Sequence, residues 1–182
     1  MDCLKSVAKS FYYFSRFILP VGLGARTVLE GETETSNLFA MTSDFSDPFV
    51  ENQEQLINCY EGTLKSVKLA LPILFKNVIK FVCDLAQNEV KESGDIKNVS
   101  NYFVLILMMA GMIDDFQDSL NEMLKAASLP VSVIVIKVGN TQPENDSEKF
   151  IKNAFPAFLS AERVYIDLLD FDKYKNEQGQ HT

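Results

Sequence analysis

The chain has 182 residues, 47% of them hydrophobic and 23% charged, a composition typical of one globular domain. Its net charge of -8, without any Lys/Arg run, argues against a nucleic-acid-binding surface and against electrostatic docking on an anionic membrane. Three widely spaced cysteines and a single histidine, His181, argue against a disulfide framework and a structural zinc site. We therefore expect a protein of a reducing, cytoplasmic compartment that carries no cofactor.

The first part of the chain predicts a helix, a strand and a polar segment. Apolar residues at helical spacing from Leu4 to Phe14 predict a helix. The stretch from Phe17 to Leu23 reads as a strand that runs into the turn Gly22-Leu23-Gly24. Residues 27–54 are polar and acidic, and within them only residues 37–42 could form a short edge strand.

Two more helices follow. A helical stripe from Leu56 to Val67 predicts the second helix. Pro72 fits the first turn of a third helix, because the missing N–H of proline costs nothing there. The apolar face of that helix extends from Leu74 to Leu85, and Glu92-Ser93-Gly94-Asp95 ends it.

The second half of the chain predicts a parallel sheet. Residues 102–109 and 131–138 are short, almost continuously apolar runs, typical of strands buried on both faces. A helix over 116–127 separates them, and a last strand is predicted over 163–169. The residues that we expect to be buried on the central strands are Val104, Ile106, Val133, Ile134 and Val135.

These elements predict a three-layer, Rossmann-like α/β sandwich with a mostly parallel sheet. We expect it to span residues 1–172 and to be followed by a polar tail over 173–182. Such folds normally begin with the strand that lies at the centre of the sheet, whereas this sequence begins with a helix.

Three segments resemble the copine family, in the family's order and spacing. Residues 17–26 (FILPVGLGAR) resemble the copine segment FPAFGFGAR, and residues 102–111 (YFVLILMMAG) resemble YFVLLIITDG. Residues 129–140 (LPVSVIVIKVGN) resemble LPMSIIIVGVGN. The combination is specific, because three matches in register are hardly chance, and it covers about residues 3–170.

The resemblance implies a von Willebrand A fold, with helices on both faces of the sheet. It also implies that this chain lacks the first, central strand and the last helix of that fold. Full-length copines carry two C2 domains before this domain, and calcium-triggered phospholipid binding belongs to them. The resemblance therefore does not extend direct membrane binding to this chain.

The resemblance further implies that the metal site is lost. The family fold holds a divalent ion through a D-x-S-x-S motif after the first strand, plus a Thr and an Asp from two later loops. A hard cation needs such oxygen ligands. The loop that resembles YGPTN reads ALPILF over 70–75, with Ile73 at the hydroxyl position. The turn that resembles TDG has Ala110 in place of the carboxylate, so we expect no bound metal.

Two acidic groups remain as candidate sites. Asp114, Asp115 and Asp118 could form a displaced cation site, but capping of the following helix is the favoured interpretation. A second group follows the last predicted strand, where ligands often bind in α/β folds, and solvated surface is the favoured interpretation. Its members are Asp167, Asp170 and Asp172.

Other motifs give no catalytic or cofactor site. Gly22-Leu23-Gly24 lacks the third glycine of a dinucleotide-binding loop and leads into a polar segment. His181 lies in the tail, so a catalytic triad has no base, and we expect no enzyme activity. A methionine cluster could be an adaptable contact surface, although core packing is favoured. The cluster consists of Met108, Met109 and Met112.

The sequence thus favours a non-catalytic protein-interaction module with a protein partner. The alternative is a truncated or vestigial copine-like fragment that modulates a full-length relative in calcium-dependent membrane signalling. Without a central strand, residues 17–23 and 102–109 would each expose a strand edge. We expect these two strands to pair directly, in parallel, within a five-stranded sheet. The alternative is pairing with another chain, including self-association through an exposed edge.

Overall fold

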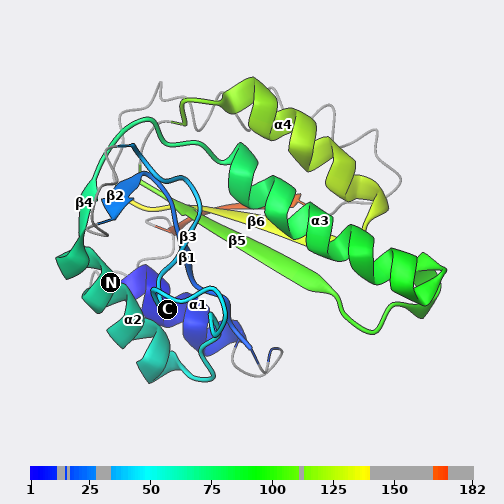
Figure 1. Cartoon of the computed structure of the whole chain (residues 1–182), viewed down its shortest axis with the longest axis horizontal. Helices are drawn as coiled ribbons and strands as arrows, with labels where there is room; N and C mark the ends of the chain where they lie inside the picture. Colours follow the sequence, from blue (N-terminus) through cyan, green and yellow to red (C-terminus); the bar gives the residue numbers. More distant parts are fainter. Residues whose placement is uncertain (12–14, 16, 28–33, 111–112, 140–165, 172–182) are drawn as a thin grey trace. The chain divides into compact units, whose positions relative to one another are not determined.

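The computed structural model describes residues 1–11, 15, 17–27, 34–110, 113–139 and 166–171 (Figure 1). The chain divides into two compact units, one formed by residues 1–73 and the other beginning at Leu74. Each unit is described by itself below.

The first unit combines two helices with two short antiparallel ladders. Helix α1 packs on helix α2. Asn52 is the N-cap of α2, and its side chain accepts a hydrogen bond from the Gln55 N–H at 2.9 Å. The core cluster contains Leu4, Val50 and Leu56. The elements are α1 (Asp2–Phe11), β1 (Val21–Gly22), β2 (Ala25–Thr27), β3 (Phe39–Ala40), α2 (Gln53–Ser66) and β4 (Val67–Leu69).

Residues 17–23 do not pair in parallel with residues 102–109, so that prediction is wrong. Ile18 instead exchanges backbone hydrogen bonds with Val50, and β1 pairs antiparallel with β3. Packing explains the second pairing, because the Phe39 ring fills the space that a Cβ at Gly22 would need. Strand β2 pairs antiparallel with β4, so the described residues form two small ladders and a three-stranded sheet rather than one five-stranded sheet.

The second unit contains the predicted parallel sheet, in the order β5-β6-β7. Phe103 lies opposite Val131, and the β5–β6 register runs without interruption to the pair Met109 and Lys137. Helices α3 and α4 lie side by side along the sheet in Figure 1. The elements are α3 (Lys76–Ser93), η1 (Ile96–Asn98), β5 (Phe103–Met109), α4 (Phe116–Lys125), η2 (Ala126–Ser128), β6 (Val131–Lys137) and β7 (Ile166–Asp170).

The C-terminus of α3 lies where the sequence predicted it, whereas the N-terminus does not. At its C-terminus the expected Gly94 adopts φ +73°, and its N–H donates to the Val90 carbonyl at 3.0 Å. Its N-terminus lies at Lys76 and not at Pro72, so the predicted start is wrong by about one turn. The first N–H groups of α3 find their acceptor on a distant residue, as described below.

The two faces of the sheet are unequally buried, since successive strand residues point to opposite faces. One face is buried where helix α3 packs on β5 and β6. The buried residues of this face include Leu105 and Leu107 of β5 and Val133 and Val135 of β6. Val104, on the opposite face, is 46% exposed, so the prediction that it is buried is wrong. The half-buried residues of that face are Ile106 and Ile134. A continuous apolar run indicates a strand but does not say which face carries a packed layer.

This asymmetry predicts different costs for the same truncation. Val133→Ala should lower the free energy of unfolding by about 2–4 kcal/mol, because it leaves a cavity beneath the helices. Val104→Ala loses the same atoms from a half-exposed position and should cost less than about 1 kcal/mol. Urea unfolding followed by circular dichroism measures both. Equal costs would mean that the two faces are packed alike.

Candidate functional site

The carboxyl ends of the three parallel strands form one edge of the second unit. In parallel α/β sheets, ligands commonly bind outside this edge. Strand β5 ends at Met109 and is followed by the exposed Ala110, while β6 ends at Lys137 and β7 at Asp170. The loop after β5 leads to the start of α4, so this edge brings the predicted acidic residues into one region.

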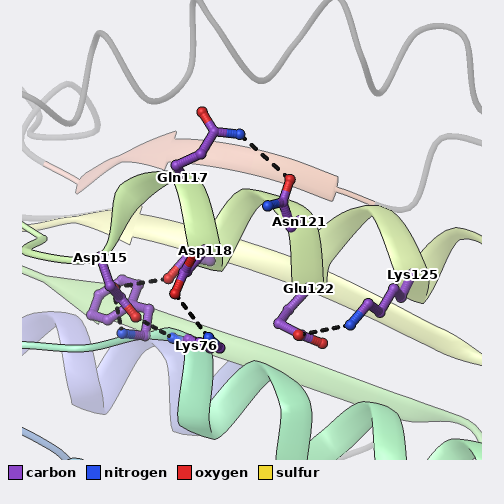
Figure 2. Close-up of polar contacts among 9 residues, drawn as sticks. Lys76, Asp115, Gln117, Asp118, Asn121, Glu122 and Lys125 are labelled. Atoms are coloured by element: carbon purple, nitrogen blue, oxygen red, sulfur yellow. Dashed lines mark hydrogen bonds and ion pairs between the residues drawn. The ribbon is translucent and has the colours of Figure 1, made fainter.

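Asp115 is the most heavily bonded carboxylate of this region (Figure 2). Its Oδ1 accepts the Phe75 N–H at 2.9 Å, and its Oδ2 accepts the Lys76 N–H at 2.8 Å. The hydroxyl of Ser119, a fully buried residue, donates to Oδ1 at 2.9 Å. One carboxylate thus joins the start of α3 to the first turn of α4.

The structure refines the capping interpretation of Asp115. Of the two candidates, Asp114 and Asp115, it is Asp115 that occupies the N-cap position of α4, but its side chain accepts no N–H from its own helix. It caps α3 instead, where Phe75 at the N-cap position has no oxygen to offer. A negative group there also interacts favourably with the positive end of the α3 dipole. The sequence signal was present, but the partner lies 40 residues away.

The neighbouring acidic residues behave differently. Asp118 accepts a hydrogen bond from the Lys76 ammonium at 2.8 Å in an ion pair that is largely exposed, and this hydrogen bond raises the pKa of Lys76. Asp114 is exposed at the start of the helix. Further along α4, Glu122 pairs with Lys125 at 2.8 Å (Figure 2). The three predicted aspartates therefore do not converge on one point.

The second acidic group is also divided. Asp170 pairs with Lys137 across the β6–β7 ladder at 3.7 Å, and both side chains are mostly buried. Asp167 is exposed on β7, and Asp172 lies outside the described residues. Within the described ranges, no three His, Cys, Asp or Glu side chains gather closely enough to hold a metal ion.

The two positions expected to be degenerate lie in different units. Ile73 belongs to the first unit, where its half-buried side chain packs against Gly24, which has φ +69°. Ala110 belongs to the second unit and is exposed. Neither side chain carries an oxygen, so neither can serve as a ligand for a hard cation. Gly22-Leu23-Gly24 leads into β2 rather than a helix, which gives no cradle for a phosphate.

Two of the three cysteines, Cys59 and Cys83, are not activated as nucleophiles. Burial, followed by the charge of Glu122, raises the pKa of Cys83 to about 11. Burial also raises the pKa of Cys59. These thiols stay protonated at neutral pH and are poor nucleophiles. Of the methionine cluster, Met109 is buried and Met108 is exposed, whereas Met112 and His181 lie outside the described residues.

Among the described residues of this region, several carboxylates are engaged by groups of the same unit. Asp115 and Asp118 accept hydrogen bonds from groups of the second unit, and Asp170 forms an ion pair with Lys137. None of the helices among the described residues is long and apolar enough to cross a membrane.

Comparisons with known proteins agree over most of the sequence. The family model for Copine matches residues 4–180. The protein BONZAI 2 of Arabidopsis thaliana is 28% identical over 118 residues, which cover 65% of this chain. The matched region spans only 19% of the length of that relative.

Proposed function

This chain belongs to the copine family, and from that premise we propose that it is a non-catalytic protein-interaction module. It recognises its partner without a metal ion, through the carboxyl edge of the β5-β6-β7 sheet. The proposal covers only the region matched by the family model. It assigns the chain no nucleic-acid binding, no direct membrane binding and a place in the cytoplasm, in keeping with its charge of -8 and its three widely spaced cysteines.

The engagement of the edge carboxylates is the observation that carries the proposal. A metal-dependent edge needs oxygen atoms that are free to coordinate, and a bound Mg²⁺ demands near-octahedral geometry. Asp115 is instead held by two N–H groups and a hydroxyl, and Asp170 is paired with Lys137. Within the second unit, Ala110 adds an exposed apolar side chain at the carboxyl end of β5, where the resembling family turn has a carboxylate.

Titration calorimetry with Mg²⁺ and with Ca²⁺ tests the metal-free part of the proposal. Neither ion should give saturable heat, because Asp115 and Asp118 already accept hydrogen bonds and Asp170 is already in an ion pair. A dissociation constant below ~0.1 mM for either ion would contradict the proposal, since functional calcium sites reach that range.

Affinity capture with the full chain tests the partner. Partner binding should survive excess EDTA, and Ala110→Arg should abolish it by placing a long cation on the exposed carboxyl end of β5. Ser128→Arg is the matched control, because Ser128 is exposed before the amino end of β6. Loss of binding in EDTA, or equal binding by both arginine variants, would contradict the proposed surface.

The second candidate is a copine-like fragment that modulates a full-length relative in calcium-dependent membrane signalling. This candidate rests on the match to the Copine family model over residues 4–180. A full-length relative, purified and added as a competitor, should then displace this chain from the shared partner. Self-association through β5, at one end of the β5-β6-β7 order, belongs to this second candidate and is measured by sedimentation velocity.

A further inference from the structure

An isolated antiparallel bridge joins Ile18 to Val50 in the first unit. The two residues exchange backbone hydrogen bonds of 3.0 and 2.8 Å, and Ile18 and Val50 face the core cluster around Leu4 and Leu56. Neighbouring residues on a strand point to the opposite face. In agreement, the neighbouring residues Phe17, Phe49 and Glu51 are exposed.

Phe17 and Phe49 form an exposed aromatic pair on this outward face. Their ring centroids are 5.8 Å apart with an interplanar angle of 59°, the tilted geometry that aromatic rings prefer. Phe17 is nevertheless 60% exposed and Phe49 is 51% exposed. Large apolar side chains gathered in the open are characteristic of interaction surfaces, and aromatic rings often contribute much of the binding energy there.

Carboxylates surround the second ring in the sequence. Asp44, Asp47 and Glu51 flank Phe49, and residues 44–51 contain no Lys, Arg or His. The Asp44 carboxylate accepts the N–H and the hydroxyl of Ser46 at 2.7 and 2.6 Å, which fixes the turn that precedes Phe49. The hydrogen bond from the Ser46 hydroxyl makes the largest contribution to lowering the pKa of Asp44, and the bond from the Ser46 N–H makes the next largest. Arg16, beside Phe17 in the sequence, lies outside the described residues.

We propose that the aromatic pair Phe17–Phe49 is a docking site for a cationic, apolar peptide segment of a partner protein. A Lys or Arg side chain of the partner lies across the rings as a cation–π contact and reaches Glu51, while an adjacent apolar side chain covers the remaining ring surface. The acidic flank selects against an anionic lipid surface and against nucleic acid, since both carry the same charge sign. This surface goes beyond the proposed function, because it lies in the first unit and uses different residues.

Fluorescence anisotropy with the full chain tests the site. The probe is a fluorescein-labelled nine-residue peptide of alternating Arg and Leu, compared with one that has Glu for Arg and one that has Ser for Leu. The Arg/Leu peptide should bind saturably with a dissociation constant below ~1 mM. The Glu-containing peptide should show no binding, and the Ser-containing peptide should bind at least about threefold more weakly.

Variants separate the aromatic and electrostatic contributions. The double variant Phe17→Ser/Phe49→Ser should weaken binding at least about tenfold, whereas Phe17→Tyr/Phe49→Tyr, which keeps the ring faces, should stay within about threefold. Glu51→Gln should weaken binding about two- to fivefold and flatten its salt dependence. Leu69→Thr is the control, because Leu69 is exposed in the same unit on β4, and it should leave the dissociation constant within about twofold.

Three outcomes would overturn the proposal. One is the absence of saturable binding of the Arg/Leu peptide to the unmodified chain. Another is equal binding of the Glu-containing peptide, or tighter binding of the chain to vesicles of anionic lipid. The third is unchanged peptide binding by the double serine variant, whose rings are exposed and whose fold a circular dichroism spectrum checks.

Discussion

Replacing Asp115 by Ala should lower the free energy of unfolding by about 3 kcal/mol. The substitution removes the carboxylate that accepts hydrogen bonds from the Phe75 N–H, the Lys76 N–H and the Ser119 hydroxyl. A buried donor left without an acceptor costs about 1–3 kcal/mol, and loss of a helix cap alone costs about 0.5–2 kcal/mol. Alanine cannot reach either N–H, so the start of α3 loses its cap even though its own sequence is unchanged.

Asp118→Ala is the matched control for this experiment. Asp118 lies on the same helix three residues later, and its side chain bonds to the exposed Lys76 ammonium. Exposed ion pairs contribute little, so this variant should lose at most about 1 kcal/mol. Guanidinium unfolding followed by far-ultraviolet circular dichroism measures both variants. Equal losses would mean that Asp115 is an ordinary surface carboxylate and that α3 needs no external cap.

Ile79→Ala should cost about 3–5 kcal/mol, because Ile79 on α3 is 0% exposed and its truncation leaves a cavity. The core of the second unit cannot easily collapse around such a gap, since the buried Val78 and Met123 are themselves closely packed. Ile96→Ala removes the same atoms from η1, where the residue is 41% exposed, and should change stability by about 0.5 kcal/mol or less. The same unfolding experiment compares them, and a loss below about 1 kcal/mol for Ile79→Ala would place α3 at the periphery.

Sequence patterns predicted the type of most elements because those patterns reflect local geometry. Apolar spacing identified α1 and α2, and apolar runs identified β5 and β6, since each pattern requires only the neighbours along the chain. The burial of Val104 was mispredicted, because a β5 run that is apolar on both sides does not record which side carries helices. The start of α3 was mispredicted for a related reason, since Pro72 is a local signal and the Asp115 cap is not.

The candidate site shows the same division between local and distant information. The sequence indicated Asp114 or Asp115 as a capping residue, because aspartate before an apolar helical run is typical of that role. It could not identify the helix that Asp115 caps, which depends on how α3 and α4 pack. The antiparallel partner of Ile18 was equally hidden, since nothing in residues 17–23 indicates that Val50 lies opposite.

The Asp115 bonds also have a consequence for the order in which the second unit folds. They join residues 40 positions apart, and the intervening chain includes all of α3 and β5. Closing a loop of that size loses entropy that is recovered only when the intervening elements are already packed. We therefore expect these bonds to form after the transition state, so that their loss leaves the folding rate nearly unchanged and accelerates unfolding. On this expectation, Asp115 slows the unfolding of the second unit and does not take part in the nucleus from which the unit folds.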